Sequence, residues 1–391
     1  RAGALNQLMD SMANGIQTLE AADNGLTSIT KTLESMQSTL RQARQDKSFQ
    51  TASYTLGAGL TSAQDISFSG GAVGDTPVDI ALGTAAVAAT AATYDGASVD
   101  LSAADPDLSA LDGETISVNG TVAYTFTNSA TGQKAALIAA LDTATGGTTT
   151  ADATGIHISV ADGTNFSIQS SDASVAAATG VAATVTTTTD GVAAVAAAAK
   201  TVDALVSEIN SNADLKGKVR ASNDNGKLRI ENQSTQELDV DGVSSSGAID
   251  GTSTGAASID GNSVRADLAE QFNELRDQLD KLADDASFNG INLLRGDNLK
   301  LTFNETGTST IDIQTKGGES INAANLGVLN IEAEDLDSDT NIDTLLGNLK
   351  TALNDVRSQS STFGSNLSIV QNRQDFTKNM INTLQTGAAN L

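Results

Sequence analysis

The sequence contains no cysteine, no tryptophan and a single histidine. Without cysteine, the chain can form neither a disulfide framework nor a thiolate metal site. The same absences remove most of the side chains that enzymes use for nucleophilic and general acid–base catalysis. Aromatic residues make up 3% of the chain, so its hydrophobic cores must consist mainly of Ala, Val, Leu and Ile. We therefore expect no enzymatic activity, no bound cofactor and no metal site.

Basic residues are also scarce, because 22 Lys and Arg stand against 48 Asp and Glu, for a formal net charge of −26. Phosphate backbones and anionic lipid surfaces both repel such a chain, so we expect no nucleic-acid partner and no membrane partner. No apolar run reaches the roughly 18 residues that a spanning helix requires. The chain begins at Arg1 without a basic-then-apolar signal segment, which leads us to expect a fragment or a processed form.

Two long stretches, one at each end of the 391-residue chain, carry apolar residues at heptad spacing. The N-terminal stretch runs from about Ala4 to Gln45, with apolar positions at Leu19, Ala22, Leu26, Ile29, Leu33, Met36, Leu40 and Ala43. The C-terminal stretch begins near Ile342 and has Leu346, Leu349, Leu353, Val356, Phe363, Leu367, Val370, Ile381, Leu384, Ala388 and Leu391. This repeat keeps a narrow apolar seam facing a partner helix. We expect the two ends to pair as antiparallel helices, with the middle of the chain looped out at one tip.

A third helical pattern covers Val264–Ala286, and Ser263 is the expected N-cap of this helix. Alternating segments at Leu299–Phe303 and Thr310–Ile313 then predict a β-hairpin. The acidic run Glu332–Asp339, before the last helix, is interpreted as a solvated loop. The residues expected to form the seam between the helices are Leu26, Ile29, Leu33, Leu275, Leu279, Leu353, Val356 and Leu367.

The middle of the chain is rich in Ala, Thr, Ser, Gly and Asp, which favours β-rich domains with thin cores. Three turn signals between alternating segments predict hairpins at Asn119-Gly120, Asp162-Gly163 and Asn225-Gly226. The second of these hairpins would join Gly155–Val160 to Asn165–Gln169.

Helical spacing at Gln133–Asp142 and Thr201–Asn210 places a helix before the second and third hairpins. A helix followed by a hairpin therefore occurs twice, at about 133–170 and 201–232, and predicts a degenerate internal repeat. The low-complexity segment Ala85–Ala92 is compatible with either a helix or a linker.

Few residues in the chain suggest a chemical site. His157 alternates with Ile156 and Ile158, so we expect it to lie on the exposed side of a strand. The run Asp239-Val240-Asp241-Gly242 faintly resembles a calcium loop, but it lacks the spacing of ligands that such loops have, so we interpret it as a turn. The sequence contains no Ser/His/Asp set, zinc-protease motif or phosphate loop that would indicate catalysis.

Several strings along the helical segments resemble bacterial flagellin. Ser287-Phe288-Asn289-Gly290-Ile291-Asn292-Leu293-Leu294 is similar to the segment that follows the second helix of the family's D1 domain. The hairpin over 299–313 and the turn Asn325-Leu326-Gly327 resemble the small β element of that domain. Residues 1–47 and 344–391 resemble its N-terminal and C-terminal helices. The two helix-plus-hairpin units resemble a motif of flagellin variable domains.

The resemblance implies an α+β fold in which a long antiparallel, coiled-coil-like helical bundle with a β-hairpin carries inserted β-rich α+β variable domains. Residues 1–49 and 264–391 would form the helical D1 rod. Residues 50–95 and 187–263 would form an inserted D2-like α+β domain, and 96–186 an outermost D3-like α+β domain. Common family members place these domains after the D1 hairpin, whereas here the insert lies between the first and second rod helices.

The function implied by the resemblance is that of a structural subunit of the extracellular bacterial flagellar filament, which assembles by lateral helix packing and serves motility. The implied partners are other flagellin subunits in the full-length protein, an export chaperone and the filament cap. The terminal D0 segments of the family are absent from the sequence, so we expect this form to be monomeric. Leu40–Lys47 has polar residues where the immune-receptor site of some flagellins has Arg and Leu, so we expect weak receptor recognition.

The alternative function is that of a cell-surface adhesin or polysaccharide-binding flagellin homologue that uses the inserted domains. Thr, Ser, Asn and Asp in the insert could hold a glycan. However, sugar sites commonly stack the ligand on aromatic faces, and the only tyrosines are Tyr54, Tyr94 and Tyr124.

Overall fold

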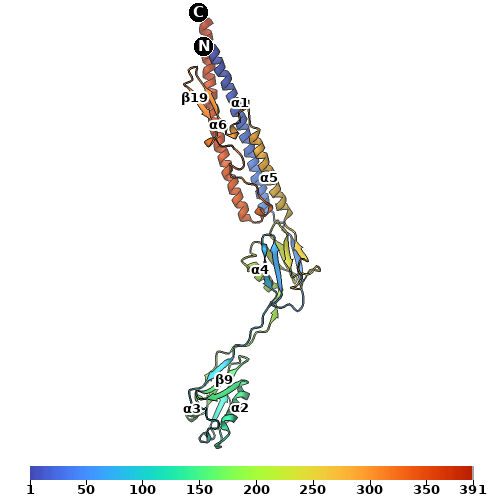
Figure 1. The fold of residues 1–391 in the computed structure, drawn as a ribbon, viewed down its shortest axis with the longest axis vertical. Helices are drawn as coiled ribbons and strands as arrows, with labels where there is room; N and C mark the ends of the chain where they lie inside the picture. Colours follow the sequence, from blue (N-terminus) through green and yellow to red (C-terminus); the bar gives the residue numbers. More distant parts are fainter. Residues whose placement is uncertain (390–391) are drawn as a thin grey trace. The chain divides into compact units, whose positions relative to one another are not determined.

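The computed structural model describes residues 1–389, which fold as a mixture of helices and small sheets (Figure 1). The chain divides into two compact units: the first comprises residues 1–58, 65–80 and 201–391, and the second comprises residues 59–64 and 81–200. The second unit therefore extends on both sides beyond 96–186, the range predicted for the outermost domain. Leu391, the last expected heptad position, lies outside the described residues.

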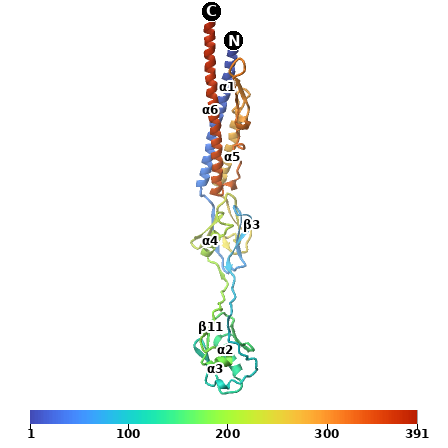
Figure 2. The same ribbon diagram turned by 90° about the vertical axis from the view of Figure 1, so that its left-hand side faces the viewer.

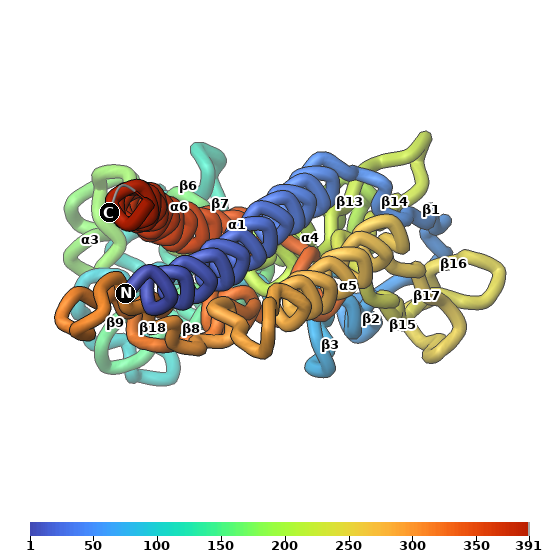
Figure 3. Tube along the Cα trace, turned by 90° about the horizontal axis from the view of Figure 1, so that it is seen from above, coloured from blue at the N-terminus to red at the C-terminus, as the bar shows by residue number. Residues whose placement is uncertain are grey.

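Three helices of the first unit form a layer that we call the helical layer: α1 (Ala2–Gln45), α5 (Ser263–Asp284) and α6 (Asp339–Ala389). Arg44 pairs with Asp343 and Ser360 bonds Asp23, so α1 and α6 are antiparallel. The start of α1 and the end of α6 accordingly lie at the same end of the layer (Figure 2). Viewed along the layer, α1 packs against both α5 and α6 (Figure 3).

The starts of two of these helices differ from the sequence prediction. The N-cap of α5 is Asn262 rather than Ser263, because the Asn262 side chain accepts the hydrogen bond from the Arg265 amide at 3.0 Å. The acidic run before α6 is not simply a loop. Ala333–Leu336 forms a short 3-10 helix, η4, which is closed by a reciprocal capping box between Glu332 and Asp335.

Between α5 and η4 the chain forms the 3-10 helices η2 (Leu293–Arg295) and η3 (Lys316–Gly318), with a β-hairpin between them. The hairpin pairs β18 (Leu299–Thr302) with β19 (Thr310–Ile313), with Leu299 opposite Ile313. The sequence prediction of a hairpin at this place is confirmed. Its residue Leu301 packs against α1, so the hairpin extends the hydrophobic core of the helical layer.

The first unit also contains two small sheets. One has the order β13-β14-β1-β16, from Val219–Asp224, Lys227–Asn232, Thr51–Leu56 and Ala248–Ile249. The other has the order β17-β15-β2-β3, from Ala257–Ile259, Leu238–Asp241, Asp65–Gly70 and Gly74–Ala81. Helix α4 (Val202–Ser211) packs on β13 and β14. The predicted turn at Asn225-Gly226 is present, with φ of 50° and 88°.

The second unit has one three-stranded and one four-stranded sheet. The first has the order β5-β9-β8, from Ala92–Asp95, Gly155–Val160 and Thr148–Asp152. The second has the order β11-β10-β6-β7, from Thr186–Thr187, Ser167–Ser170, Thr115–Val118 and Thr121–Thr125. The helices are α2 (Gln133–Thr145) and α3 (Ala173–Thr179), with a 3-10 turn, η1 (Ser109–Leu111). The hairpin predicted at Asn119-Gly120 joins β6 to β7.

The hairpin predicted around Asp162-Gly163 is wrong. Strand β9 pairs with β5 and β8, whereas β10 pairs with β6 and β11, so the two segments enter different sheets. Gly163, at φ +82°, turns the chain away from β9. The true hairpin of this region joins β8 to β9 across a two-residue turn, with Asp152 opposite Gly155.

This β8–β9 hairpin makes the internal repeat more regular than the sequence indicated. In the first unit, α4 precedes the hairpin β13–β14, and β1 pairs with β14. In the second unit, α2 precedes the hairpin β8–β9, and β5 pairs with β9. Tyr54 of β1 and Tyr94 of β5 are both buried.

The low-complexity segment Ala85–Ala92 is extended rather than helical. It faces the returning segment through bridges between Val87 and Val195 and between Thr90 and Val192. The short strands β4 (Gly83–Thr84) and β12 (Ala198–Ala199) continue the same antiparallel register. Of the two alternatives left open by the sequence, the helix is wrong, and the segment forms one strand of a two-stranded ribbon.

Candidate functional site

The seam residues predicted from the heptads lie in one hydrophobic core of the helical layer. Those buried in it are Leu26, Ile29, Leu33, Leu279, Leu353 and Val356, whereas Leu275 and Leu367 are partly buried against it. Each helix alone exposes too narrow an apolar stripe to bury itself. The common core therefore accounts for the long helices, and it makes the helical layer the candidate functional element of the chain.

Two glycines inside α1 let other segments approach the helix closely. A Cβ atom at Gly25 would lie 2.8 Å from Ala286 Cβ and 2.8 Å from Leu294 Cδ1, and one at Gly15 would lie 2.6 Å from Leu301 Cδ1. Neither glycine was predicted from the sequence as a packing position. A signal was available, because glycine inside a helix lowers its stability relative to alanine. A glycine in an otherwise helical pattern therefore suggests a position where close packing leaves no room for a side chain.

A buried arginine joins the ends of all three helices of the helical layer. Arg265, in the first turn of α5, is 1% exposed. Its guanidinium donates to the Asp46 carbonyl at 2.8 Å, to the Leu336 carbonyl at 2.9 Å and to the Asp339 carboxylate at 3.3 Å. It also lies over the Phe49 ring, 4.8 Å from the ring centroid. A planar group with five donors suits such a site, where three chain segments meet.

Carboxylates beside Arg265 connect the helical layer to the sheets of the same unit. Asp337 accepts hydrogen bonds from the Thr235 amide at 2.7 Å and from the Ser234 hydroxyl at 2.9 Å. Asp337 is thus not the solvated loop residue that the sequence predicted. Asp46 accepts from the Asn262 side-chain amide at 2.6 Å. Burial opposes ionisation of Asp46, but the hydrogen bonds from Asn262 and Ser48 prevail and lower its pKa.

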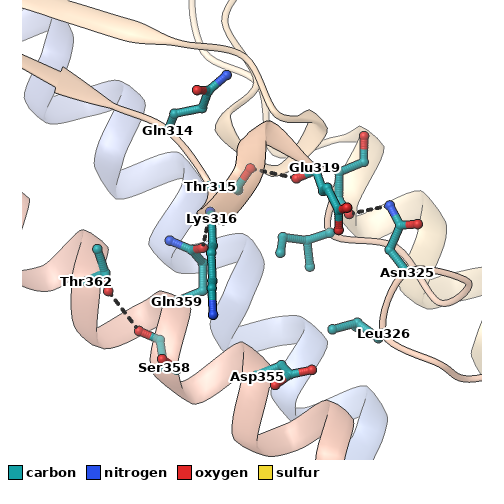
Figure 4. A pocket seen from close by; sticks show the side chains of 12 residues that line it. Gln314, Thr315, Lys316, Glu319, Asn325, Leu326, Asp355, Ser358, Gln359 and Thr362 are labelled. Carbon is teal, nitrogen blue, oxygen red and sulfur yellow. Dashed lines mark hydrogen bonds between the residues drawn. The ribbon is translucent and has the colours of Figure 1, made fainter.

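A groove of about 490 Å³ lies between η3, the segment after it, and α6 (Figure 4). The Lys316 amide donates to Gln359 Oε1 at 3.2 Å, and the Thr315 hydroxyl donates to the Glu319 carbonyl at 2.6 Å. Glu319 and Asp355 each contribute a carboxylate to the lining of the groove. Within residues 1–389 no cluster of three His, Cys, Asp or Glu could hold a metal ion. The groove offers polar contacts, and its lining contains no nucleophile paired with a base.

Large apolar side chains remain exposed on the first unit. They include Ile369 and Phe376, seven residues apart on α6, and Leu329, after β19. Arg373 lies between the Phe303 and Phe376 rings, with centroid distances of 5.0 and 5.6 Å. Residues seven apart share one face of a helix. Ile369 and Phe376 therefore lie on one exposed face of α6, with Arg373 over the Phe376 ring.

The tyrosines are poorly placed for stacking on a sugar. Tyr54 and Tyr94 are buried, and Tyr124 packs edge-on against Phe126 while its hydroxyl donates to Gln133. The buried rings of Tyr54 and Tyr94 cannot stack on a ligand and so add no support to the polysaccharide-binding alternative, which stays a prediction.

The turn predicted for the run Asp239-Val240-Asp241-Gly242 is wrong over its first three residues, because they belong to strand β15 and pair with β2. Asp241 accepts a hydrogen bond from the Gly255 amide at 2.9 Å.

Comparison with known proteins points to the helical layer. Residues 251–299 match the family model described as the bacterial flagellin N-terminal helical region. The match covers Asn262, all of α5 and η2, and the Leu294 side chain that packs against Gly25. No curated protein matches the chain significantly. None of the helices described is both long enough and apolar enough to cross a bilayer.

Proposed function

We propose that this chain is a structural subunit of a bacterial flagellar filament. The observation that carries the proposal is the match of residues 251–299 to the flagellin N-terminal helical region. The matched helix, α5, shares one hydrophobic core with α1 and α6. The function is therefore mechanical: helices pack along one another and transmit load, and no chemical step is involved.

The finer architecture belongs to the same proposal. Residues 1–49 and 264–391 form a D1-like rod of antiparallel, coiled-coil-like helices, and the intervening chain forms D2-like and D3-like α+β domains. The match to an N-terminal region starts at residue 251, well inside the chain. This position supports an insert that interrupts the N-terminal helical region between α1 and α5, rather than one that follows the β18–β19 hairpin.

The proposed partners are other subunits of the same kind, an export chaperone and the filament cap, and the location is extracellular. The chain as given is monomeric in this proposal. Recognition by the innate-immune receptor of some flagellins is weak or absent, because Leu40–Lys47 contains polar residues within the relevant stretch. A strong signal in a receptor-reporter assay would contradict this last point.

The filament proposal is tested in the bacterium that encodes the chain. Filaments sheared from its cells should contain peptides from both the helical layer and the inserted domains. Deletion of the gene should remove the filaments in electron micrographs and abolish swimming, and the wild-type gene should restore both. Cells that keep normal filaments after the deletion, with the protein missing from the sheared fraction of the parent, would refute the proposal.

A further inference from the structure

The only histidine of the chain lies between two carboxylates in the second unit. His157 is on the central strand β9, opposite Asp95 of β5 in the strand register. Its Nδ1 atom is 2.6 Å from Asp95 Oδ1, and its Nε2 atom is 3.1 Å from Asp152 Oδ1 at the end of β8. The two ring nitrogens thus reach the two strands on either side of β9. Only an imidazolium can donate to both carboxylates at once.

A catalytic role does not fit this arrangement, although Thr154, His157 and Asp95 follow the order of a catalytic triad. The Thr154 hydroxyl is 2.7 Å from His157 Nε2, but it is also 2.7 Å from Asp152 Oδ1. The carboxylate is the stronger acceptor, so the hydroxyl proton goes to Asp152 and Nε2 keeps its own proton. While the ring is protonated, Nε2 is therefore neither a general base nor a metal ligand.

The charges around the ring favour its protonated form. The strands packed against β9 are β5 and β8, and the charged groups that they direct toward the ring are Asp95 and Asp152. Tyr94, the neighbour of Asp95, is buried, and its pKa is raised to about 12, chiefly by burial. The hydrogen bond with Asp95, and then that with Asp152, raises the pKa of His157. Hydrogen bonds from Thr154 chiefly lower the pKa of Asp152 to about 2, with a further contribution from His157.

We propose that His157 is a pH-operated clamp that ties β5 and β8 to β9 when its ring is protonated. Deprotonation leaves one proton on the ring. Because Asp95 lies at the shorter distance, this proton stays on Nδ1 in the hydrogen bond to Asp95, and Nε2 no longer donates to Asp152. A group whose pKa is raised by folding contributes stability fully below its unfolded value of about 6.5 and loses it as pH rises through the folded pKa. Asp152, whose pKa is lowered, is ionised in the folded protein throughout that range. The inference is independent of the filament proposal.

Because the chain has one histidine, proton NMR of the intact protein sees a single imidazole. The expected folded-state pKa of His157 lies above about 6.5. The variants Asp95→Asn and Asp152→Asn should each lower it, since each removes one carboxylate. The matched control is Asp112→Asn, which removes an exposed carboxylate of the same unit that makes no hydrogen bond or ion pair to the residues described. This control should leave the titration unchanged.

Thermal unfolding gives a second readout. Wild type should be more stable than His157→Gln at about pH 5.5, and the difference should shrink by about pH 8.5. A wild-type pKa at or below the unfolded value, or the same pH profile of stability in both proteins, would overturn the clamp. Stoichiometric Zn²⁺ binding at neutral pH that disappears in His157→Gln would also overturn it, because it would indicate a metal site.

Discussion

Arg265 donates two hydrogen bonds to the main-chain carbonyl of Asp46, from Nη2 at 2.8 Å and from Nε at 3.3 Å. Asp46 caps the end of α1, and Arg265 lies in the first turn of α5, 219 residues later in the chain. The inserted sheets and the whole second unit leave and return between these two residues. One buried side chain therefore closes the helical layer at the point where the insert interrupts it.

Replacing this side chain should destabilise the helical layer strongly. Arg265→Met leaves the carbonyls of Asp46 and Leu336 without donors, so we expect a loss of about 3–5 kcal/mol. Arg295→Met is the control, because the Arg295–Asp284 pair is exposed and such pairs contribute about 0–1 kcal/mol. Urea unfolding monitored by helical circular dichroism measures both. Equal losses in the two variants would show that Arg265 has no special role.

Adding one methyl group at Gly25 should destabilise the protein, although alanine is the better helix former. The new Cβ would lie 2.8 Å from Ala286 Cβ, and overpacking of this kind costs about 1–3 kcal/mol. Gly364→Ala in α6 meets nothing within 4 Å, so it should instead stabilise the helix by about 0.5–1 kcal/mol. The two melting temperatures should therefore move in opposite directions. A stabilised Gly25→Ala variant would contradict the close packing.

The loss in the free energy of unfolding on truncating a seam residue to alanine should increase with the burial of its side chain. Leu33→Ala and Leu353→Ala remove side chains from the core of the helical layer, so each should cost about 2–5 kcal/mol. Leu367→Ala should cost less, because Leu367 is partly buried. Leu329→Ala, at a position 68% exposed, should change little. If thermal unfolding of Leu33→Ala matched that of wild type, the seam would not hold the helices together.

The end of the helical layer should weaken in acid. Burial alone would raise the pKa of Asp46, but the hydrogen bonds from Asn262 and Ser48 together outweigh burial and lower it. Its contribution is therefore present above the unfolded pKa of about 3.9 and is lost as pH falls through the folded value. The stability difference between wild type and Asp46→Asn should be largest near neutrality and shrink as pH falls below the unfolded value of about 3.9. Asp10→Asn, at an exposed position of α1, should show no such pH-dependent difference.

Local signals account for the parts of the fold that were predicted correctly. The turns at Asn119-Gly120 and Asn225-Gly226 need positive φ, which Asn and Gly adopt readily. Strand pairing cannot be predicted from such local signals. The segment Gly155–Val160 is compatible with any neighbouring strand in which apolar and polar residues alternate in the same way. Its partners, β5 and β8, are selected by the packing of the second unit. The hairpin predicted at Asp162-Gly163 failed for this reason.

The sequence by itself determined the long helices, their apolar faces and most of the tight turns, because these depend on residues a few positions apart. Only the tertiary structure decided which residues meet across large separations: Gly25 with Ala286, Arg265 with Asp46, and His157 with Asp95. Nothing local distinguishes Arg265 from an exposed arginine. Its role arises because helix ends distant in the chain bring unpaired carbonyl groups together around one buried guanidinium.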